Sequence, residues 1–413
     1  MTARQDLFAG VALLVVWAIV TLYRHWGLWG TDMSALYWAG HFYAQGALDQ
    51  IYVGGQDFFW EIPPDEWLAL TRVHGASPLD ITPYIYPPIW AALLAPITQT
   101  LDPHAFFNLT QGINVTCISL SVWLAWRIFG AGHVPFWQWA GISVVLLQLT
   151  MPAVLALQLN QPQIAVTCIV LLAFYRLCAG HSKSAGAILA LAAAIKLSPA
   201  ALILLFVMRR DWRALASFAV FGALFASLSI LGTNLDLHWQ LLDRISLLDG
   251  KILVSRINYS IEPFIFQLVE LVQGRADFFI TNYTIFDQPV WMGPLTKLAL
   301  LIGFGLVWWI TRRHPDPRKL WLQLILLAPI LMILSPLAWA HYLLLPLFLI
   351  PGIFVILPQR QAILWLVLIL VLFSDTLWQI LIETQMTVWA PLILGVISIG
   401  FCLKSLAIWA LRT

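Results

Sequence analysis

Long apolar segments separated by short connections run through this 413-residue chain and constrain what it can fold into. A helix that crosses a bilayer needs about 20 mostly apolar residues. Only 10% of the residues are charged, against about a quarter in soluble domains. We therefore expect an all-α polytopic membrane protein, with residues 1–413 forming a single domain. About twelve segments fit the length of a span: 7–29, 87–101, 104–128, 136–157, 163–180, 185–208, 214–232, 290–311, 320–337, 341–357, 361–381 and 388–410.

The basic residues predict the topology of these spans. Short cytoplasmic loops carry an excess of Lys and Arg. With the N-terminus in the cytoplasm, alternation puts four basic groups inside: Arg209, Arg210 and Arg213; Arg312, Arg313, Arg318 and Lys319; Arg360; Lys404 and Arg412. Arg127 and Lys183 fall outside, so 136–180 fits least well, and a broken or re-entrant helix is an alternative there.

Two long loops, about 30–86 and 233–289, then lie on the extracytoplasmic side. Each holds seven of the chain's 20 acidic residues, so polar function is concentrated on this face. Aromatic residues such as Trp67 are interleaved with the acids. This pattern is typical of short helices at the membrane interface with their rings at headgroup depth. Simple anchoring of the loops to the bilayer is the alternative.

Several polar residues within apolar segments are costly at membrane depth. Lys196 lies within the segment 185–208, where an ammonium must be paired or face water. It is a site candidate, with a structural ion pair as the alternative. Pro199 would bend this helix. His341, next to a proline-broken turn and Trp339, either contacts a lipid phosphate or serves packing.

Two short polar clusters complete the candidates. Residues 158–163 contain four amides, including Asn160 and Gln161, which form either a plain turn or a break facing a sugar or headgroup. Arg256 precedes Asn258 and Ser260, and guanidinium groups bind phosphate through paired hydrogen bonds. Pairing of Arg256 with a loop acid is the alternative.

Some classes of partner are disfavoured by composition. The net charge is +2 and no basic run suits a nucleic acid backbone. No cluster of His and carboxylates has the spacing of metal ligands, so neither a metal nor a cofactor is expected, although a divalent ion at Asp32 is an open alternative.

The order of these motifs resembles glycosyltransferase family 87. The motifs are Asp32 with Tyr37 and Ala39-Gly40, Gly46, Tyr52, Tyr86-Pro87-Pro88, Asn160-Gln161, Lys196 with Pro199, Asn258 with Ser260, and Ser335-Pro336 with His341. The resemblance implies a GT-C fold with about 12 transmembrane helices and two large extracytoplasmic loops carrying short interfacial helices. It also implies a polyprenyl-phosphate sugar donor and a catalytic acid near the end of the first helix, which is Asp32. Asn160 stands where Gly often precedes the Gln, and Tyr259 stands where Gln is common.

The residues suit such a reaction. Asp32 can act as general base on an acceptor hydroxyl, and Lys196, Arg256 and His341 can stabilise the departing phosphate. One base and direct displacement predict inversion. The substrate-binding residues are expected to be Tyr37, Tyr86, Asn160, Gln161, Lys196, Arg256, Asn258, Ser260 and His341.

The resemblance implies a transferase that moves a hexose to a lipid or glycan acceptor, with mannose expected and arabinose or another pentose as an alternative. It would be an integral protein of the cytoplasmic membrane of a bacterium, with the active site facing the extracytoplasmic side. A transporter or flippase for a lipid-linked sugar is the alternative, since it would share the spans and the intramembrane lysine.

Overall fold

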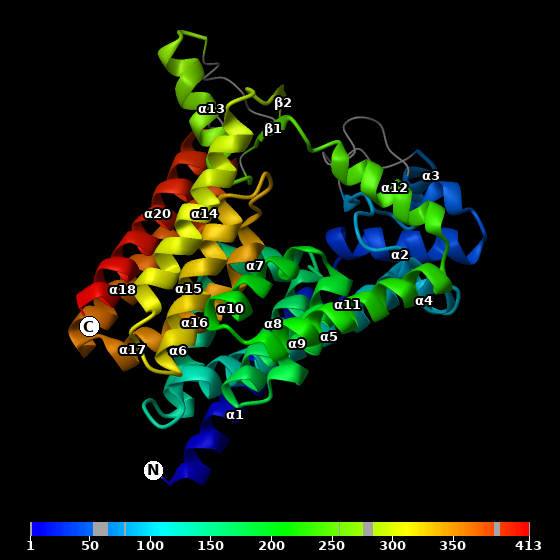
Figure 1. The fold of residues 1–413 in the computed structure, drawn as a ribbon. Helices are drawn as coiled ribbons and strands as arrows, with labels where there is room; N and C mark the ends of the chain where they lie inside the picture. Colours follow the sequence, from blue (N-terminus) through cyan, green and yellow to red (C-terminus); the bar gives the residue numbers. More distant parts are fainter. Residues whose placement is uncertain are drawn as a thin grey trace. The chain divides into compact units, whose positions relative to one another are not determined.

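The computed structural model describes residues 2–52, 65–77, 80–255, 257–275, 284–383 and 389–412, and it is mostly helical, as an all-α membrane protein should be (Figure 1). The helices up to residue 232 are α1 (Ala3–His25), α2 (Thr31–Ala44), α3 (Asp65–Val73), α4 (Ile89–Thr98), α5 (Pro103–Ala125), α6 (Phe136–Leu149), α7 (Met151–Gln158), α8 (Gln163–Cys178), α9 (Ser182–Ile195), α10 (Ile203–Arg209) and α11 (Trp212–Gly232). The later elements are α12 (Leu235–Ser246), β1 (Lys251–Val254), α13 (Ile261–Val272), β2 (Thr284–Asp287), α14 (Met292–Thr311), α15 (Arg318–Ile333), α16 (Leu344–Leu349), α17 (Ile353–Ile356), α18 (Gln359–Leu372), α19 (Asp375–Glu383) and α20 (Trp389–Arg412).

Within the part of the chain that the structure describes, five helices are long and apolar enough to cross a membrane. They are α1, α5 with its extension to Gly130, α11, α14 and most of α20. The other expected spans are helical but shorter. The structure thus establishes helices suited to a membrane, whereas the count of about twelve spans stays a prediction.

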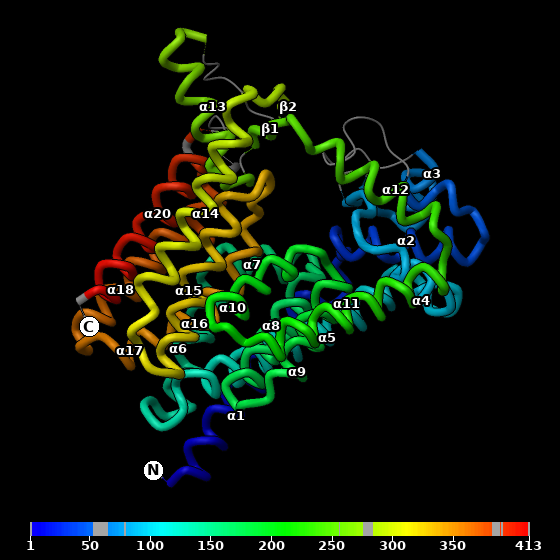
Figure 2. The backbone as a smooth tube through the Cα atoms, viewed as in Figure 1, coloured from blue at the N-terminus to red at the C-terminus, as the bar shows by residue number. Residues whose placement is uncertain are grey.

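Several expected spans are interrupted at identifiable residues (Figure 2). Between α6 and α7, Thr150 is extended, and Pro152 follows, so the segment 136–157 is broken. Thr150 pairs with Ser374 at the break between α18 and α19, and the Met151 N–H donates to the Phe373 carbonyl at 2.8 Å. The backbone groups released by one helix break are therefore satisfied at another, as apolar surroundings require.

The chain divides into two compact units. One contains residues 1–14, 125–155 and 250–413, and is called the C-terminal unit below; the other contains residues 15–124 and 156–249, and is called the Asp32 unit. The expectation of a single domain over 1–413 stays a prediction.

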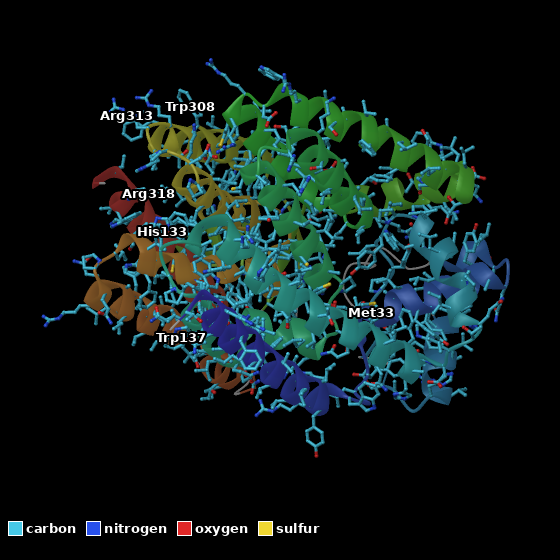
Figure 3. All side chains as sticks on the ribbon, turned by 90° about the horizontal axis from the view of Figure 1, so that it is seen from below. Met33, His133, Trp137, Trp308, Arg313 and Arg318 are labelled. Carbon is cyan, nitrogen blue, oxygen red and sulfur yellow. The ribbon has the colours of Figure 1, made fainter. Side chains whose placement is uncertain are left out.

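In the C-terminal unit, α14, α15 and α20 pack against one another (Figure 1). Arg313 and Arg318 lie at the connection between α14 and α15 (Figure 3). The guanidinium of Arg318 lies 4.8 Å from the ring of Trp409, and that of Arg312 lies 5.6 Å from the ring of Trp308. Basic and aromatic side chains therefore meet at this end of the helices, as they do at membrane interfaces.

A two-stranded antiparallel sheet, which the sequence analysis did not anticipate, lies in the second long loop. Lys251 pairs with Asp287 and Val254 pairs with Thr284. The apolar residues of β1 are buried, and Ile252 and Val254 pack with Phe266 of α13 and other apolar side chains. This burial favours β1 as a strand, because β-branched residues suit a half-buried pleated surface.

The Asp32 unit has a large aromatic core built from the first long loop. Tyr37 and Trp38 of α2, Tyr52, Trp67 and Tyr84 are each at most 4% exposed. Trp67 donates its indole N–H to the Gln50 carbonyl at 3.0 Å and stacks on Phe42. The ring is therefore part of the protein core in this structure, while its expected position at headgroup depth stays a prediction.

Candidate functional site

Asp32 lies in the first turn of α2, where its carboxylate is half-buried. Helix α2 begins two residues after Trp29, whose indole donates to the Asp80 carbonyl at 2.7 Å. The positive end of a helix dipole favours a negative charge in the first turn. The chain thus holds the Asp32 carboxylate in the first turn of a helix that follows α1, a helix that the sequence analysis did not anticipate.

The segment between α7 and α8 contacts Asp32 through two groups. The Asp32 N–H donates to the Leu159 carbonyl at 3.0 Å, and Gln161 Nε2 donates to Asp32 Oδ2. Gln161 is only 3% exposed. The sequence analysis expected Gln161 to bind substrate, and this role stays a prediction; in this structure Gln161 contacts the Asp32 carboxylate.

Asn160 adopts a left-handed backbone conformation, with φ of 51°. Among residues other than Gly, Asn is one of the few that enter this region readily. The departure from the expected Gly at this position is thus explained, since both residues allow the same turn. A Cβ at Gly30 would lie 3.1 Å from Asn160, so the two segments approach closely here.

Asn160 is anchored to one face of α5. Its Nδ2 donates to the Phe107 carbonyl and to Thr110 Oγ1, both at 2.9 Å, and its Oδ1 accepts from Asn114 Nδ2 at 2.8 Å. Residues 107, 110 and 114 follow helical spacing. The sequence analysis missed Thr110 and Asn114, and the available signal was this polar stripe in an otherwise apolar span.

Lys196 is the cation that lies near Asp32. It follows the last residue of α9 in extended conformation, and Pro199 has no N–H to donate to the Ile195 carbonyl, so the helix stops here. The charge of Asp32 acts electrostatically on the Lys196 ammonium. Lys196 Nζ also lies 6.0 Å from the centre of the Tyr86 ring.

Tyr86 is held in place by its neighbours in the loop. Its carbonyl accepts from the Tyr52 hydroxyl at 2.6 Å, and the Tyr84 hydroxyl donates to the Pro87 carbonyl at 2.7 Å. Burial raises the pKa of both Tyr52 and Tyr84, so these hydroxyls stay protonated and keep donating. The structure thus brings Asp32, Gln161, Lys196 and Tyr86 into one neighbourhood.

Tyr37 belongs to the core beside this neighbourhood. It is 4% exposed, its ring packs on Trp38 and Phe106, and its hydroxyl donates to the Leu101 carbonyl at 2.9 Å. Its expected role in substrate binding stays a prediction, and its contacts in this structure are those of a packing residue.

The remaining candidates lie in the C-terminal unit. Asn258 is fully buried and its Nδ2 donates to the carbonyls of Leu253 and Pro336, while its Oδ1 accepts from the N–H groups of Ser260 and Ala338. It therefore ties residues 253–260 to residues 336–338. Arg256 lies outside the described residues.

Ser260 and His341 are also buried in this unit. Ser260 caps α13 by accepting from the Glu262 N–H at 3.3 Å. Burial raises the pKa of the Glu262 carboxyl, and hydrogen bonds with Thr296 and Gln288 act in the opposite direction. His341 is 5% exposed and packs edge-on against Tyr342, with the ring centres 4.8 Å apart.

Tyr259, the second departure from the expected pattern, serves packing. Its ring lies 4.8 Å from that of Trp378, and a Cβ added at Gly395 would meet it at 2.5 Å. Glycine at position 395 is thus required for this close approach.

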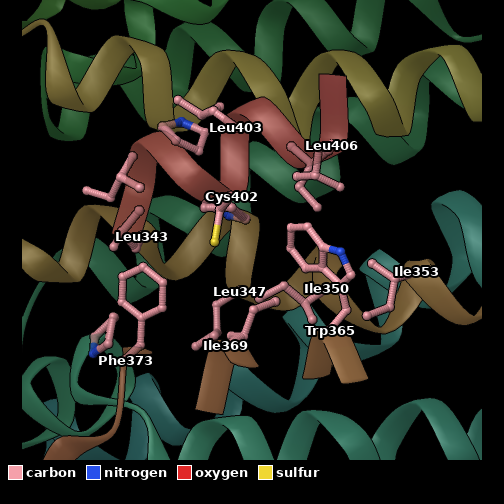
Figure 4. Close-up of a pocket in the computed structure, with 15 residues that line it drawn as sticks. Leu343, Leu347, Ile350, Ile353, Trp365, Ile369, Phe373, Cys402, Leu403 and Leu406 are labelled. Carbon is pink, nitrogen blue, oxygen red and sulfur yellow. The ribbon is translucent and has the colours of Figure 1, made fainter. Parts of the chain in front are cut away.

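The C-terminal unit also contains an apolar pocket (Figure 4). Its lining comes from α7, α15, α16, α17, α18 and α20 and from the residues that flank α16 and α18, and includes Leu343, Phe373 and Cys402. No charged side chain lines it, so its contacts are mainly apolar, with the Cys402 thiol and the Trp365 indole among them. Across the described ranges, no group of three or more His, Cys, Asp or Glu side chains is placed to hold a metal ion.

The chain matches the model of a known protein family. The model of glycosyltransferase family 87 matches residues 84–336, which is more than half of the chain. Most of the candidates lie within this range: Tyr86, Asn160, Gln161, Lys196, Arg256, Asn258 and Ser260. Asp32, Tyr37 and His341 lie outside it. No curated protein matches this chain.

Proposed function

Because this chain belongs to glycosyltransferase family 87 and is a membrane glycosyltransferase, we propose that it transfers a hexose from a polyprenyl-phosphate donor to an acceptor hydroxyl. Mannose is the expected sugar, and a lipid or a glycan is the expected acceptor. Asp32 acts as general base and the anomeric configuration is inverted. Family membership favours this reaction over transport of a lipid-linked sugar.

The observation that carries the proposal is the pairing of a carboxylate with a nearby cation in the Asp32 unit. Asp32 is half-buried, is oriented by Gln161, and interacts electrostatically with Lys196. A base must accept a proton where the attacking oxygen sits. A fixed cation must lie where the leaving group gains charge. The two groups required for direct displacement are therefore present in one neighbourhood.

The reaction balances with these groups alone. The Asp32 carboxylate takes the proton from the acceptor hydroxyl as that oxygen attacks the anomeric carbon. The bond between this carbon and the phosphate oxygen breaks, and polyprenyl phosphate leaves with the electron pair. A phosphate is already a good leaving group, so it needs stabilisation of its charge rather than a proton. We assign this stabilisation to Lys196. The same role for Arg256 and His341 stays a prediction.

We further propose that the reaction takes place at the extracytoplasmic face of a bacterial cytoplasmic membrane. A cytoplasmic N-terminus would bring the end of α1, and hence Asp32, to the outer side. The basic groups at residues 209–213 and 312–319 would then lie inside, in agreement with the distribution of Lys and Arg in membrane proteins.

Replacement of Asp32 by Asn tests the proposal, because it removes the base and keeps the shape of the side chain. Purified Asp32→Asn protein, assayed with polyprenyl-phosphate mannose and an acceptor, should lose about 10²–10⁴-fold in turnover. Asp49→Asn, the same change at an exposed acid of the same loop, is the matched control and should leave turnover unchanged.

Two outcomes would contradict the proposal. Full turnover by Asp32→Asn would remove Asp32 as the base. Movement of the lipid-linked sugar across vesicle membranes by the wild-type protein, without formation of a glycosylated product, would instead support a transporter.

A further inference from the structure

We infer that residues 159–161 form a positioning element, in which Gln161 orients the Asp32 carboxylate instead of binding substrate. The inference rests on the proposed role of Asp32 as base. It assigns Asn160 and Gln161, both expected from the sequence to bind substrate, to the support of the reacting group.

The Gln161 amide is oriented with its nitrogen toward Asp32. A carboxylate only accepts hydrogen bonds, so the amide nitrogen must face Asp32, as it does. The amide oxygen accepts from the Gln163 N–H at 3.4 Å. Gln161 therefore has partners at both ends of its amide, and it occupies Oδ2 of Asp32.

Gln161 is itself held in place by its neighbour Asn160, which is anchored on α5. Asn160 uses both of its N–H donors on α5, through the Phe107 carbonyl and Thr110 Oγ1, and its Oδ1 accepts from Asn114. With both donors used inside the protein and the side chain 4% exposed, Asn160 cannot donate to a sugar without breaking these bonds. Its left-handed backbone turns the chain directly before Gln161.

The same segment also contacts the backbone of Asp32. The Asp32 N–H donates to the Leu159 carbonyl, so residues 159 and 161 contact the backbone and the side chain of the same residue. Two attachments fix both the position of the helix N-terminus and the rotation of the carboxylate. Such support is needed because a displacement of about 1 Å at a reacting group can cost on the order of 10²-fold in rate.

The test uses purified full-length Gln161→Met, which keeps the length of the side chain and removes the donor. Loss of orientation should lower kcat about 10–100-fold, with little change in KM for polyprenyl-phosphate mannose. The donor also stabilises the charged form of the carboxylate. Its removal should therefore move the acidic limb of the pH profile of kcat/KM to higher pH. The Lys196 ammonium still interacts electrostatically with Asp32 in this variant.

Three further variants make the test decisive. Gln161→Glu puts a second carboxylate against Asp32 and should move the acidic limb further in the same direction. Asn160→Gly keeps the left-handed turn but loses the anchor on α5, and should lower kcat less than Gln161→Met. It also serves as the second variant if Gln161→Met fails to fold. Gln158→Ala, at an exposed amide three residues away, should match wild type.

Opposite results would overturn the inference. If Gln161→Met raises KM for the donor while kcat and the pH profile stay as in wild type, Gln161 binds substrate and does not position Asp32. Unchanged kinetics in both Gln161→Met and Asn160→Gly would also reject it. Failure of the proposed function is separate, since it would appear as an active Asp32→Asn variant.

Discussion

The neighbourhood of Asp32 and the neighbourhood of Asn258 contain similar residue types but differ in what their polar groups do. Around Asn258, the amide is fully buried and all its hydrogen bonds go to backbone groups. Around Asp32, the amide of Asn160 also has its hydrogen bonds inside the protein, but the half-buried Asp32 carboxylate is charged and interacts electrostatically with the half-buried Lys196 ammonium.

The difference teaches how to separate scaffold from chemistry in an apolar chain. Buried amides are well suited to tie loops together, because they satisfy backbone groups without carrying charge. A charged group that is only half-buried can still reach a substrate, and its desolvation makes its electrostatic effect stronger. We therefore expect variants near Asp32 to change the rate and variants near Asn258 to change the stability.

Lys196→Met should give the largest effect among the remaining tests of this contrast. It removes the cation that we assign to the leaving phosphate, and loss of such a group costs about 10²–10³-fold in kcat. The measurement is single-turnover sugar transfer, with melting temperature as a check on folding. Lys183→Ala, at an exposed lysine of α9, is the matched control. Wild-type turnover in Lys196→Met would show that Lys196 does not act in the reaction, and the neighbourhood of Asp32 would then no longer differ in this respect from that of Asn258.

Asn258→Ala should reduce stability much more than rate. It leaves the N–H groups of Ser260 and Ala338 and two carbonyls without their partner, and buried unsatisfied groups cost about 1–3 kcal/mol each. We expect a clear fall in the melting temperature in lipid nanodiscs, with activity per folded molecule close to wild type. A variant with normal stability but weaker donor binding would show that Asn258 contacts substrate, as the sequence suggested.

Ser260→Ala should give the smallest effect. It removes the side chain that caps α13, and loss of an N-cap costs about 1 kcal/mol. Thermal unfolding would show a small shift, and Ser260→Asp should restore most of it because Asp also caps helices well. A large loss of activity with unchanged melting would point to a role beyond capping.

The sequence predicted the helical segments well because their signal is local. Each expected span falls on helical elements, although several are interrupted, and Thr150 shows that the segment 136–157 is broken, which was the alternative given for 136–180. The pairing of β1 with β2 was missed. Each strand has only four residues, and the paired residues lie 30 to 36 positions apart in the sequence, so no local pattern reveals the pairing. The burial of Trp67 in a protein core was also not foreseen, because the pattern of an amphipathic loop does not say which apolar surface it packs on.

The sequence singles out candidate residues for the site, whereas their contacts depend on the fold. Asp32 and Lys196 stood out because charges are rare in an apolar chain. By contrast, the link from Gln161 to Asp32 depends on a turn at Asn160 and an anchor on α5, which only the fold brings together. For Tyr37 and Tyr259, sequence gives the residue type, whereas packing against Phe106 and Trp378 gives the surroundings.

The separation of Asp32 from Gln161 by 129 positions has a consequence for biogenesis. At a synthesis rate of about 5–20 residues per second, roughly ten seconds pass between the two residues leaving the ribosome. During that interval residues 125–155, which belong to the other unit, are also made. Asp32, next to α1, therefore leaves the ribosome well before the segment that orients its carboxylate has been made.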